Sequence, residues 1–405
     1  MKSLIKTVTL KNGLTLVGEP NSHAKSLSLG FFVKTGGRDE VEGESGLSHF
    51  LEHMMFKGTA KRTAEQVNFD LGNIGAQANA YTSEENTVYY ASVLPEYLEN
   101  LHEVLSDMLR PALDPKEFFT EQKVILEEIA LYRDRPQFWF FQELLKDYYG
   151  QNPLGQPVLG TEQSVSALTP EVMRSYFDRR YCPSNMVLSC AGDFNWERFV
   201  ELSEQNCGSW TKFNVARQYH EFKHATLDKI YHRPKLNLAQ YVMSVPGVSA
   251  NSSSRFALGV LGVILGDHVG SRLYWALVDS GLADSASASN DENDGSGLFT
   301  IYASCLPENI KQVEQIIDQE LAKMKDISEQ ELERAKTKLA TRVVSSGELP
   351  LGRMMALGNG QIYRGKCDSL DNIMTQVMAV TREEILSWVA QTNFVEASRF
   401  RLMPE

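Results

Sequence analysis

A short internal repeat is the feature of this 405-residue chain that most constrains its fold. Residues 90–96 read YASVLPE and residues 302–308 read YASCLPE, six identities in seven at an offset of 212. In each copy a strand-type run precedes the match, and the proline suits the first turn of an amphipathic helix. The apolar stripes of these two helices are Leu98, Leu101, Leu105, Met108 and Ile310, Val313, Ile317, Leu321. Such repeats indicate duplicated units, so we predict two similar α+β halves.

A polar stretch separates the predicted halves. Residues 210–232 are polar and weakly patterned, and we place the boundary between Gly208 and Leu236. The predicted organisation is a first half over residues 1–215, a linker over 216–235 and a second half over 236–405. The first half opens with a predicted β-hairpin, because Asn12-Gly13 favours a tight turn between two strand-type runs.

Composition and charge restrict the functional classes. The chain has 42% hydrophobic residues, as ordinary globular proteins do, and a formal net charge of −12. This charge disfavours nucleic acids and anionic membranes as partners and fits cationic peptides better. The five cysteines form no C-x-x-C pair, which favours a reducing compartment over a disulfide framework or a thiolate metal site. Without an apolar signal region or an 18-residue apolar run, we expect a cytoplasmic protein with no membrane span.

The pattern His49-Phe50-Leu51-Glu52-His53 carries the chemistry predicted for the first half. Residues i and i+4 share one face of a helix, so both histidines can present a ring nitrogen to one metal ion. Glu52 stands close enough to act on a metal-activated water, as in the H-x-x-E-H order of some zinc peptidases. A salt-bridged surface helix is the alternative, but the apolar neighbours leave little of this helix for solvent, and buried charges need partners.

A third metal ligand is expected from the acidic helix over residues 121–129. A catalytic zinc site needs three protein ligands and an open position. Glu121 and Glu128 lie two turns apart on one face, with Val124 and Ile125 predicted to pack inward between them. Glu127 points off that face. We predict that one glutamate of the pair binds the metal and that the other supports a ligand from behind.

Taken together, these motifs resemble the pitrilysin-type (M16, inverzincin) zinc metallopeptidases, which include mitochondrial processing peptidase and insulin-degrading enzyme. The resemblance extends over nearly the whole chain. Its pattern is closest to the short processing-peptidase-like members and their zinc-bearing beta subunit. Besides the histidine motif and the glutamate pair, it rests on the stretches 78–83 (ANAYTS), 152–155 (NPLG), 158–161 (VLGT), 181–186 (YCPSNM) and 270–273 (GSRL).

The resemblance implies a zinc-dependent endopeptidase that hydrolyses extended peptides and holds one Zn²⁺ per chain. The implied metal ligands are His49, His53 and Glu128, with Glu52 as the catalytic base and Glu121 as a further catalytic residue. The implied peptide-binding edge is the strand through Ala78, Asn79 and Ala80. Each half is expected to be a mainly antiparallel sheet covered by helices on one side, in the LuxS/metallopeptidase-like α+β class. The halves of two such chains would enclose a chamber.

The second half carries no metal motif. A shift of 212 residues replaces the histidine motif by Leu261–Leu265 and Glu128 by Ala340. In self-sufficient relatives the resemblance implies a substrate-gripping arginine and, seven residues later, a tyrosine; here these positions hold Leu277 and Asp284. We therefore expect a dimer with a zinc-less paralogous subunit. The alternative is a homodimer in which Arg272 or Tyr274 takes over or the pair is dispensable.

Two other functions stay open at this point: a catalytically silent scaffold, and a peptide-binding subunit of a larger complex. The cleavage preference is not predicted, because residues 137–142 (QFWFFQ) replace the acidic residues that the resemblance would use to read an arginine. This aromatic run is either a hydrophobic subsite or part of a core, and we favour the core.

Overall fold

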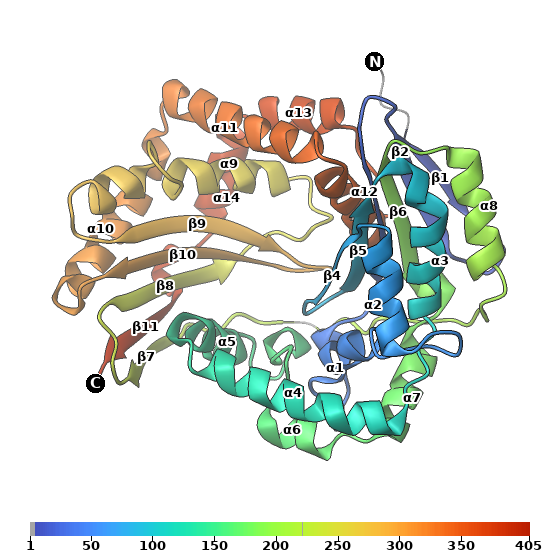
Figure 1. Ribbon diagram of the computed structural model, residues 1–405. Coiled ribbons are helices and arrows are strands. Elements are labelled where there is room, and N and C mark those ends of the chain that lie inside the picture. The colour runs from blue at the N-terminus through green and yellow to red at the C-terminus, as the bar shows by residue number, and fades with distance from the viewer. Residues whose placement is uncertain (1–4, 221) are drawn as a thin grey trace. The chain divides into compact units, whose positions relative to one another are not determined.

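The computed structural model describes residues 5–220 and 222–405, and the chain divides into two compact units (Figure 1). The first unit contains the described residues up to Arg133, together with Gln151–His220 and Ser345–Ser369. The second contains Asp134–Gly150, residues 222–344 and Leu370–Glu405. Each unit is built around one sheet, so the predicted α+β class is confirmed.

Six strands form the sheet of the first unit, in the order β1-β2-β6-β3-β5-β4. Among the strand pairs of the described residues in this sheet, only β2 and β6 are parallel. The predicted hairpin is confirmed: β1 and β2 pair in antiparallel fashion, and Gly13 between them has a φ of 95°, which glycine adopts without strain. The strands are β1 Lys6–Thr9, β2 Thr15–Pro20, β3 Leu27–Val33, β4 Gln77–Thr82, β5 Thr87–Val93 and β6 Met186–Gly192.

Five strands form the sheet of the second unit, in the order β7-β11-β8-β10-β9, and only β7 and β11 are parallel. Apart from β1, the two sheets have the same strand order and directions. The repeated heptapeptide starts within β5 and β10, and both predicted apolar stripes are buried. Two homologous halves are thus confirmed. The strands are β7 Asp228–Arg233, β8 Ala239–Pro246, β9 Ser285–Glu292, β10 Gly297–Cys305 and β11 Ser398–Pro404.

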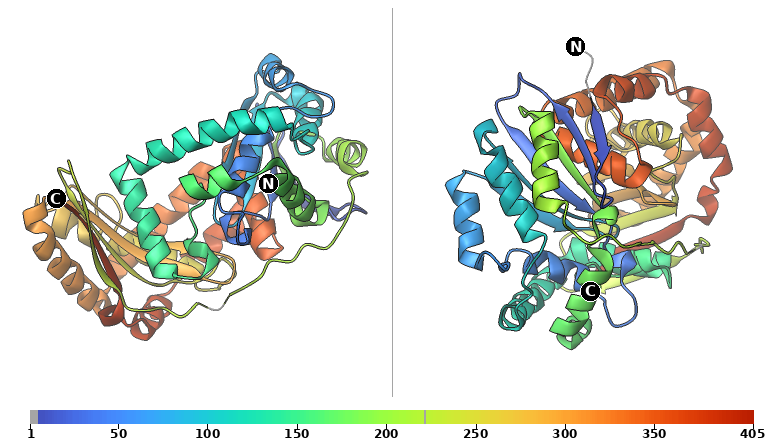
Figure 2. Two further views of the ribbon diagram at one scale, coloured as in Figure 1. Left: turned by 90° about the horizontal axis from the view of Figure 1, so that it is seen from below. Right: turned by 90° about the vertical axis from the view of Figure 1, so that its right-hand side faces the viewer.

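Helices cover both faces of the first sheet (Figures 1 and 2). Strand β3 is buried along its whole length, because Phe31 joins the larger core and Phe32 joins a smaller core with Met354 and Leu357 of α12. The right-hand view of Figure 2 shows α8 lying across the strands. The helices are α1 Leu47–Met54, α2 Ala64–Asn73, α3 Leu98–Met108, α4 Pro115–Arg133, α6 Glu162–Ala167, α7 Pro170–Arg180, α8 Trp196–Cys207 and α12 Pro350–Arg364.

In the second unit the main core lies between one face of the sheet and a layer of helices. The opposite face meets α5, where the ring centroids of Phe140 and Phe141 lie 5.7 Å from Tyr231 and 5.9 Å from Tyr302, respectively. Phe140 is fully buried and is core, as favoured above for the run, whereas Trp139 and Phe141 are half-buried and Phe138 is 36% exposed. The helices are α5 Pro136–Tyr149, α9 Arg255–Leu265, α10 Ile310–Ala322, α11 Glu329–Gly347, α13 Leu370–Met378 and α14 Arg382–Gln391.

The compact units do not follow the order of the sequence. Helix α5 comes from the first half of the chain and belongs to the second unit, whereas α12 comes from the second half and belongs to the first unit. Strand β7 lies inside the stretch that the sequence analysis assigned to the linker. The sequence did not indicate this strand, because its mostly polar residues contain no apolar run. In the described residues, none of the helices combines the length and the apolar composition that crossing a lipid bilayer demands.

Candidate metal centre

The helix that carries the two histidines starts at a residue that has to be glycine. Gly46, the N-cap of α1, has a φ of 90°, and a Cβ atom there would lie 2.7 Å from the carbonyl oxygen of Leu159. Both oxygens of the buried Glu40 carboxyl accept backbone N–H groups at this end, 2.9 Å from Gly46 N and 2.6 Å from Ser48 N. Such bonds satisfy donors that a helix N-terminus leaves free, so Glu40 sets where α1 begins.

Three side chains converge beside α1. One ligand atom each of His49, His53 and Glu128 lies within 4.8 Å of the others. Nε2 of His49 is 3.8 Å and Nε2 of His53 is 3.6 Å from Oε2 of Glu128. These separations are too long for hydrogen bonds, but two ligands bound to one zinc ion lie about 3.3 Å apart. Two imidazoles and a carboxylate are the donor set of many zinc peptidases, so the residues present fit this ion.

The two histidines have different electrostatic surroundings. Burial, with a smaller contribution from His53, lowers the pKa of His49 to about 3, so this ring is neutral as a metal ligand must be. Burial also acts to lower the pKa of His53, but the hydrogen bond to Glu121 and the charge of Glu128 outweigh it and raise that pKa. Nδ1 of His49 is buried and has no hydrogen-bond partner in the described part of the chain.

Glu121 holds His53 from the side away from Glu128. Oε1 of Glu121 is 2.8 Å from Nδ1 of His53, which directs the other ring nitrogen toward Glu128. Its second oxygen lies 2.5 Å from Nζ of Lys57. Burial would raise the pKa of Glu121, but the bonds from His53 and Lys57 together lower it, so the carboxylate stays ionised. The structure thus separates the roles of the two glutamates, which the sequence left open.

Glu52 lies between the two histidines in the sequence of α1 and is 9% exposed. Burial raises its pKa, and this effect exceeds the opposing effect of a hydrogen bond from Thr82. Oγ1 of Thr82 donates to Oε2 of Glu52 over 2.6 Å. A carboxylate with a raised pKa is a stronger base than one in water, which suits it to accept a proton.

The predicted peptide-binding residues lie on β4, the edge strand of the first sheet. Ala78 and Asn79 are exposed and Ala80 is half-buried. The backbone N–H of Ala80 donates to Oδ1 of Asn79 over 2.9 Å, so a peptide carbonyl has to replace this side chain to use that donor. An edge strand with accessible backbone groups can add an extended peptide as a further strand.

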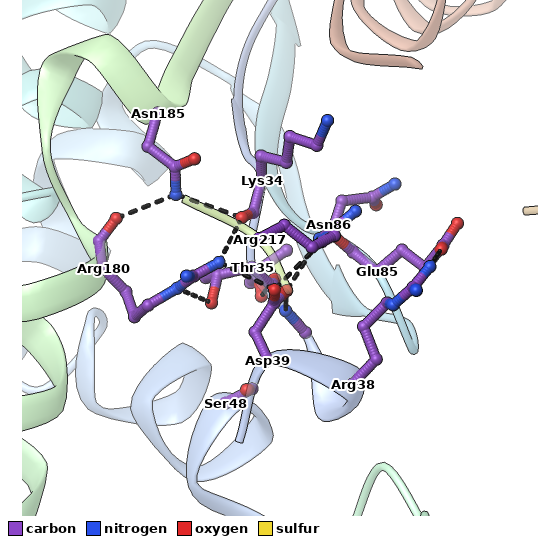
Figure 3. A network of polar contacts seen from close by, with 12 residues as sticks. Lys34, Thr35, Arg38, Asp39, Ser48, Glu85, Asn86, Arg180, Asn185 and Arg217 are labelled. Atoms are coloured by element: carbon purple, nitrogen blue, oxygen red, sulfur yellow. Dashed lines mark hydrogen bonds and ion pairs between the residues drawn. The ribbon is translucent and has the colours of Figure 1, made fainter. Parts of the chain in front are cut away.

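A buried ion cluster forms around Asp39, which precedes α1 in the chain (Figure 3). Asp39 accepts from two guanidinium groups, at 2.9 Å from Arg180 and 2.7 Å from Arg217. All three side chains are at least nine-tenths buried. Arg217 also donates to the backbone carbonyl of Glu85, and Arg180 donates to that of Lys34 over 2.9 Å. This cluster ties the segment that carries Arg217 to the turn from which Glu40 reaches α1.

Sequence reasoning missed several of these supports and misplaced one side chain. Glu40, Thr82 and Arg217 lie 9 to 164 residues from the histidines, and no spacing rule links them to the site. Val124 was expected to pack inward but is 44% exposed, whereas Ile125 is buried. Consecutive helix residues are turned by about 100°, so only one of the two can face the core. Glu127 is exposed, as expected.

Two family profiles match consecutive parts of the chain. Residues 16–162 match the family described as Insulinase (Peptidase family M16). Residues 167–339 match the family described as Peptidase M16 inactive domain. All the residues that converge on the candidate metal centre lie in the first of these two segments.

Relatives and solved structures with similar sequences or folds cover nearly the whole chain. The uncharacterized zinc protease YmxG of Bacillus subtilis is 32% identical over 97% of this chain and 96% of its own length. The uncharacterized zinc protease ML0855 of Mycobacterium leprae is 34% identical over 93% of this chain and 86% of its own length. A protease structure from Helicobacter pylori superposes with a TM-score of 0.92 at 22% identity, covering 99% of this chain and 100% of that one.

Replacing Asp39 by asparagine should lower the free energy of unfolding by about 3 to 5 kcal/mol, because two buried guanidinium groups lose their counter-charge. Urea denaturation of the metal-free protein measures this, so that loss of metal does not contribute. Glu99→Gln is the matched control, since it breaks the 2.7 Å pair with Arg198 on the exposed surface and should change stability little. Equal losses in both variants would show that the cluster adds nothing beyond a surface pair.

Proposed function

The chain belongs to peptidase family M16, and from that premise we propose that it is a zinc-dependent endopeptidase with Glu52 as its catalytic base. The observation that carries the proposal is the convergence of His49, His53 and Glu128 within 4.8 Å. Glu52 lies on α1, the short helix that also carries the two histidines. Zinc ligation by His49, His53 and Glu128 is the simplest use of two imidazoles and a carboxylate that face one another at more than hydrogen-bond distance.

In the proposed mechanism, His49, His53 and Glu128 would hold a zinc ion, which would supply a Lewis acid that lowers the pKa of the attacking water and polarises the substrate carbonyl. Glu52 accepts a proton from that water as its oxygen forms the new bond to the carbonyl carbon. The same carboxyl then returns the proton to the amide nitrogen as the C–N bond breaks. Glu121 keeps the His53 ring in one orientation through the 2.8 Å bond to Nδ1.

The proposed substrate is an extended peptide, bound in a chamber that two chains form together. Backbone pairing along Ala78, Asn79 and Ala80 would hold a peptide with little regard to its side chains. This pairing would also keep the peptide extended around the bond to be cut, and an extended peptide can enter a chamber. The chain's net charge of −12 favours substrates that are themselves cationic.

A catalytically silent scaffold or a peptide-binding subunit remains the second candidate. The description of the second profile as an inactive domain favours it for residues 167–339. The first segment argues against it for the chain as a whole. Burial of the Glu52 carboxyl costs stability, and a protein without catalysis would gain nothing that offsets this cost.

Glu52→Gln should reduce kcat for a quenched peptide or casein by about 100 to 10,000-fold, because the amide cannot accept the proton. Zinc content should stay at the wild-type level, since the side chain is nearly isosteric and is not a ligand. Cleavage at the wild-type rate would remove Glu52 from the mechanism. Wild-type protein that is fully loaded with zinc and cleaves no peptide would favour the scaffold.

Glu128→Gln should lower zinc content sharply, whereas Glu127→Gln should not. The two residues are neighbours with the same charge, but Oε2 of Glu128 faces both histidines and Glu127 is exposed. Metal analysis of both purified variants after dialysis against a weak chelator measures the difference. Equal retention of zinc in the two variants would place the third ligand elsewhere.

We also propose that the active unit is a dimer with a zinc-less paralogous chain. Leu277 is fully buried in the second core, and Asp284 carries the wrong charge to bind a carbonyl or an oxyanion. Arg272 is not available as a substitute, because it pairs with Glu331 at 2.7 Å and donates to the backbone carbonyl of Lys323. A homodimer would therefore have to rely on Tyr274 or on no such donor.

Adding extract of the source cells to the purified chain should raise kcat/KM by about 100-fold, the amount that an oxyanion donor supplies. The same extract with the Glu52→Gln chain is the control, because it subtracts the peptidases that the extract itself contains. Mass spectrometry of the co-purified protein should identify a family member without the H-x-x-E-H motif. Full activity of the pure chain, unchanged by extract, would rule out the partner.

A further inference from the structure

We propose that Thr82 is the positioning residue of Glu52, holding one carboxylate oxygen so that the other faces the attacking water. The proposal rests on the proposed peptidase function and adds a residue to it. The observation behind it is the 2.6 Å hydrogen bond from Oγ1 of Thr82 to Oε2 of Glu52. This length is typical of a hydroxyl that donates to an ionised carboxylate.

The direction of this hydrogen bond follows from the neighbours of Thr82. Its hydroxyl has one proton and two possible acceptors, Glu52 at 2.6 Å and the hydroxyl of Thr87 at 3.4 Å. Thr87 lies directly opposite Thr82 in the β4–β5 ladder, and its own hydroxyl donates to the backbone carbonyl of Thr35 over 3.0 Å. The Thr82 proton therefore goes to the nearer and charged acceptor, Glu52.

The consequence is an asymmetric carboxylate. In the described residues, Oε1 of Glu52 takes part in no hydrogen bond, whereas Oε2 is bound to Thr82. A glutamate side chain has three rotatable bonds, and without such a bond its carboxylate would sample several orientations. The Thr82 hydroxyl removes this freedom and leaves Oε1 without a hydrogen-bond donor, so that it can accept the proton over the required distance of about 2.6 to 3.2 Å.

Thr82 also links the catalytic base on α1 to β4, the strand proposed to bind the substrate. It is the last residue of β4 and lies two residues after Ala80. Strand β4 is fixed through its ladder with β5, where Ala80 pairs with Tyr89 and Thr82 with Thr87. A peptide added along β4 therefore binds in register with the residue that orients Glu52. Sites built on strands in this way hold their geometry better than sites on loops.

The test compares Thr82→Val, which removes the hydroxyl and keeps the shape, with Thr82→Ser, which keeps the hydroxyl. Thr82→Val should lower kcat about 10 to 100-fold with KM and zinc content unchanged, because only the orientation of the base is lost. Thr82→Ser should restore most of the rate. Thr87→Val is the matched control, since it removes a buried hydroxyl from the facing strand without touching Glu52, and its kcat should stay near wild type.

A second readout does not depend on activity. Unfolding free energies of the metal-free Thr82→Val, Glu52→Leu and double variants should be non-additive, because valine removes the donor and leucine removes the acceptor of the same hydrogen bond. Additive values, or a kcat of Thr82→Val equal to that of wild type, would overturn the positioning role. If the zinc-loaded wild type cleaves no peptide while the stability cycle is non-additive, the contact stands and the proposed peptidase function is what fails.

Discussion

The bond between the Glu40 carboxyl and the start of α1 is the interaction on which the site depends. Gly46 and Ser48 donate their backbone N–H groups to it, and His49 follows at the next position. The residue before Glu40 is Asp39, which two buried guanidinium groups hold in place. A helix as short as α1 has little stability of its own. Its direction, and with it the direction of both histidines, is therefore determined by these anchors and by the core beneath it.

The two halves show how one topology serves different purposes. Their sheets share strand order and direction. In each sheet a helix follows the corresponding inner strand, which is β3 in the first half and β8 in the second. In the first half this helix is α1, which carries two histidines and Glu52. In the second half it is α9, where residues 261–265 are apolar and buried. Buried charged groups cost free energy unless they have partners, so the apolar second copy avoids a cost that the first copy bears.

Helices α5 and α12 link the two halves of the sequence in a way that the repeat does not reveal. Each joins the unit formed mainly by the other half of the chain. Gly358 of α12 lies so close to the ring of Phe32 that a Cβ atom would be 2.2 Å away, so this helix is fitted to its sheet by the absence of a side chain. Covering both faces of β3 explains why that strand is buried along its whole length and, apart from Ser28, lacks the polar positions of a half-exposed strand.

The sequence by itself determined the features that depend on neighbours along the chain. The repeat established two homologous halves, and the spacing of His49, Glu52 and His53 placed three functional groups within one helix, because helical periodicity converts spacing into a shared face. Only the tertiary structure decided that Glu128 faces the Nε2 atoms of both histidines while Glu121 bonds Nδ1 of His53, since the two glutamates lie on the same face of α4. It alone supplied Glu40, Thr82 and Arg217, whose roles arise from contacts between residues 8 to 178 positions apart. Such contacts form when the core closes, and no local pattern in the chain encodes them.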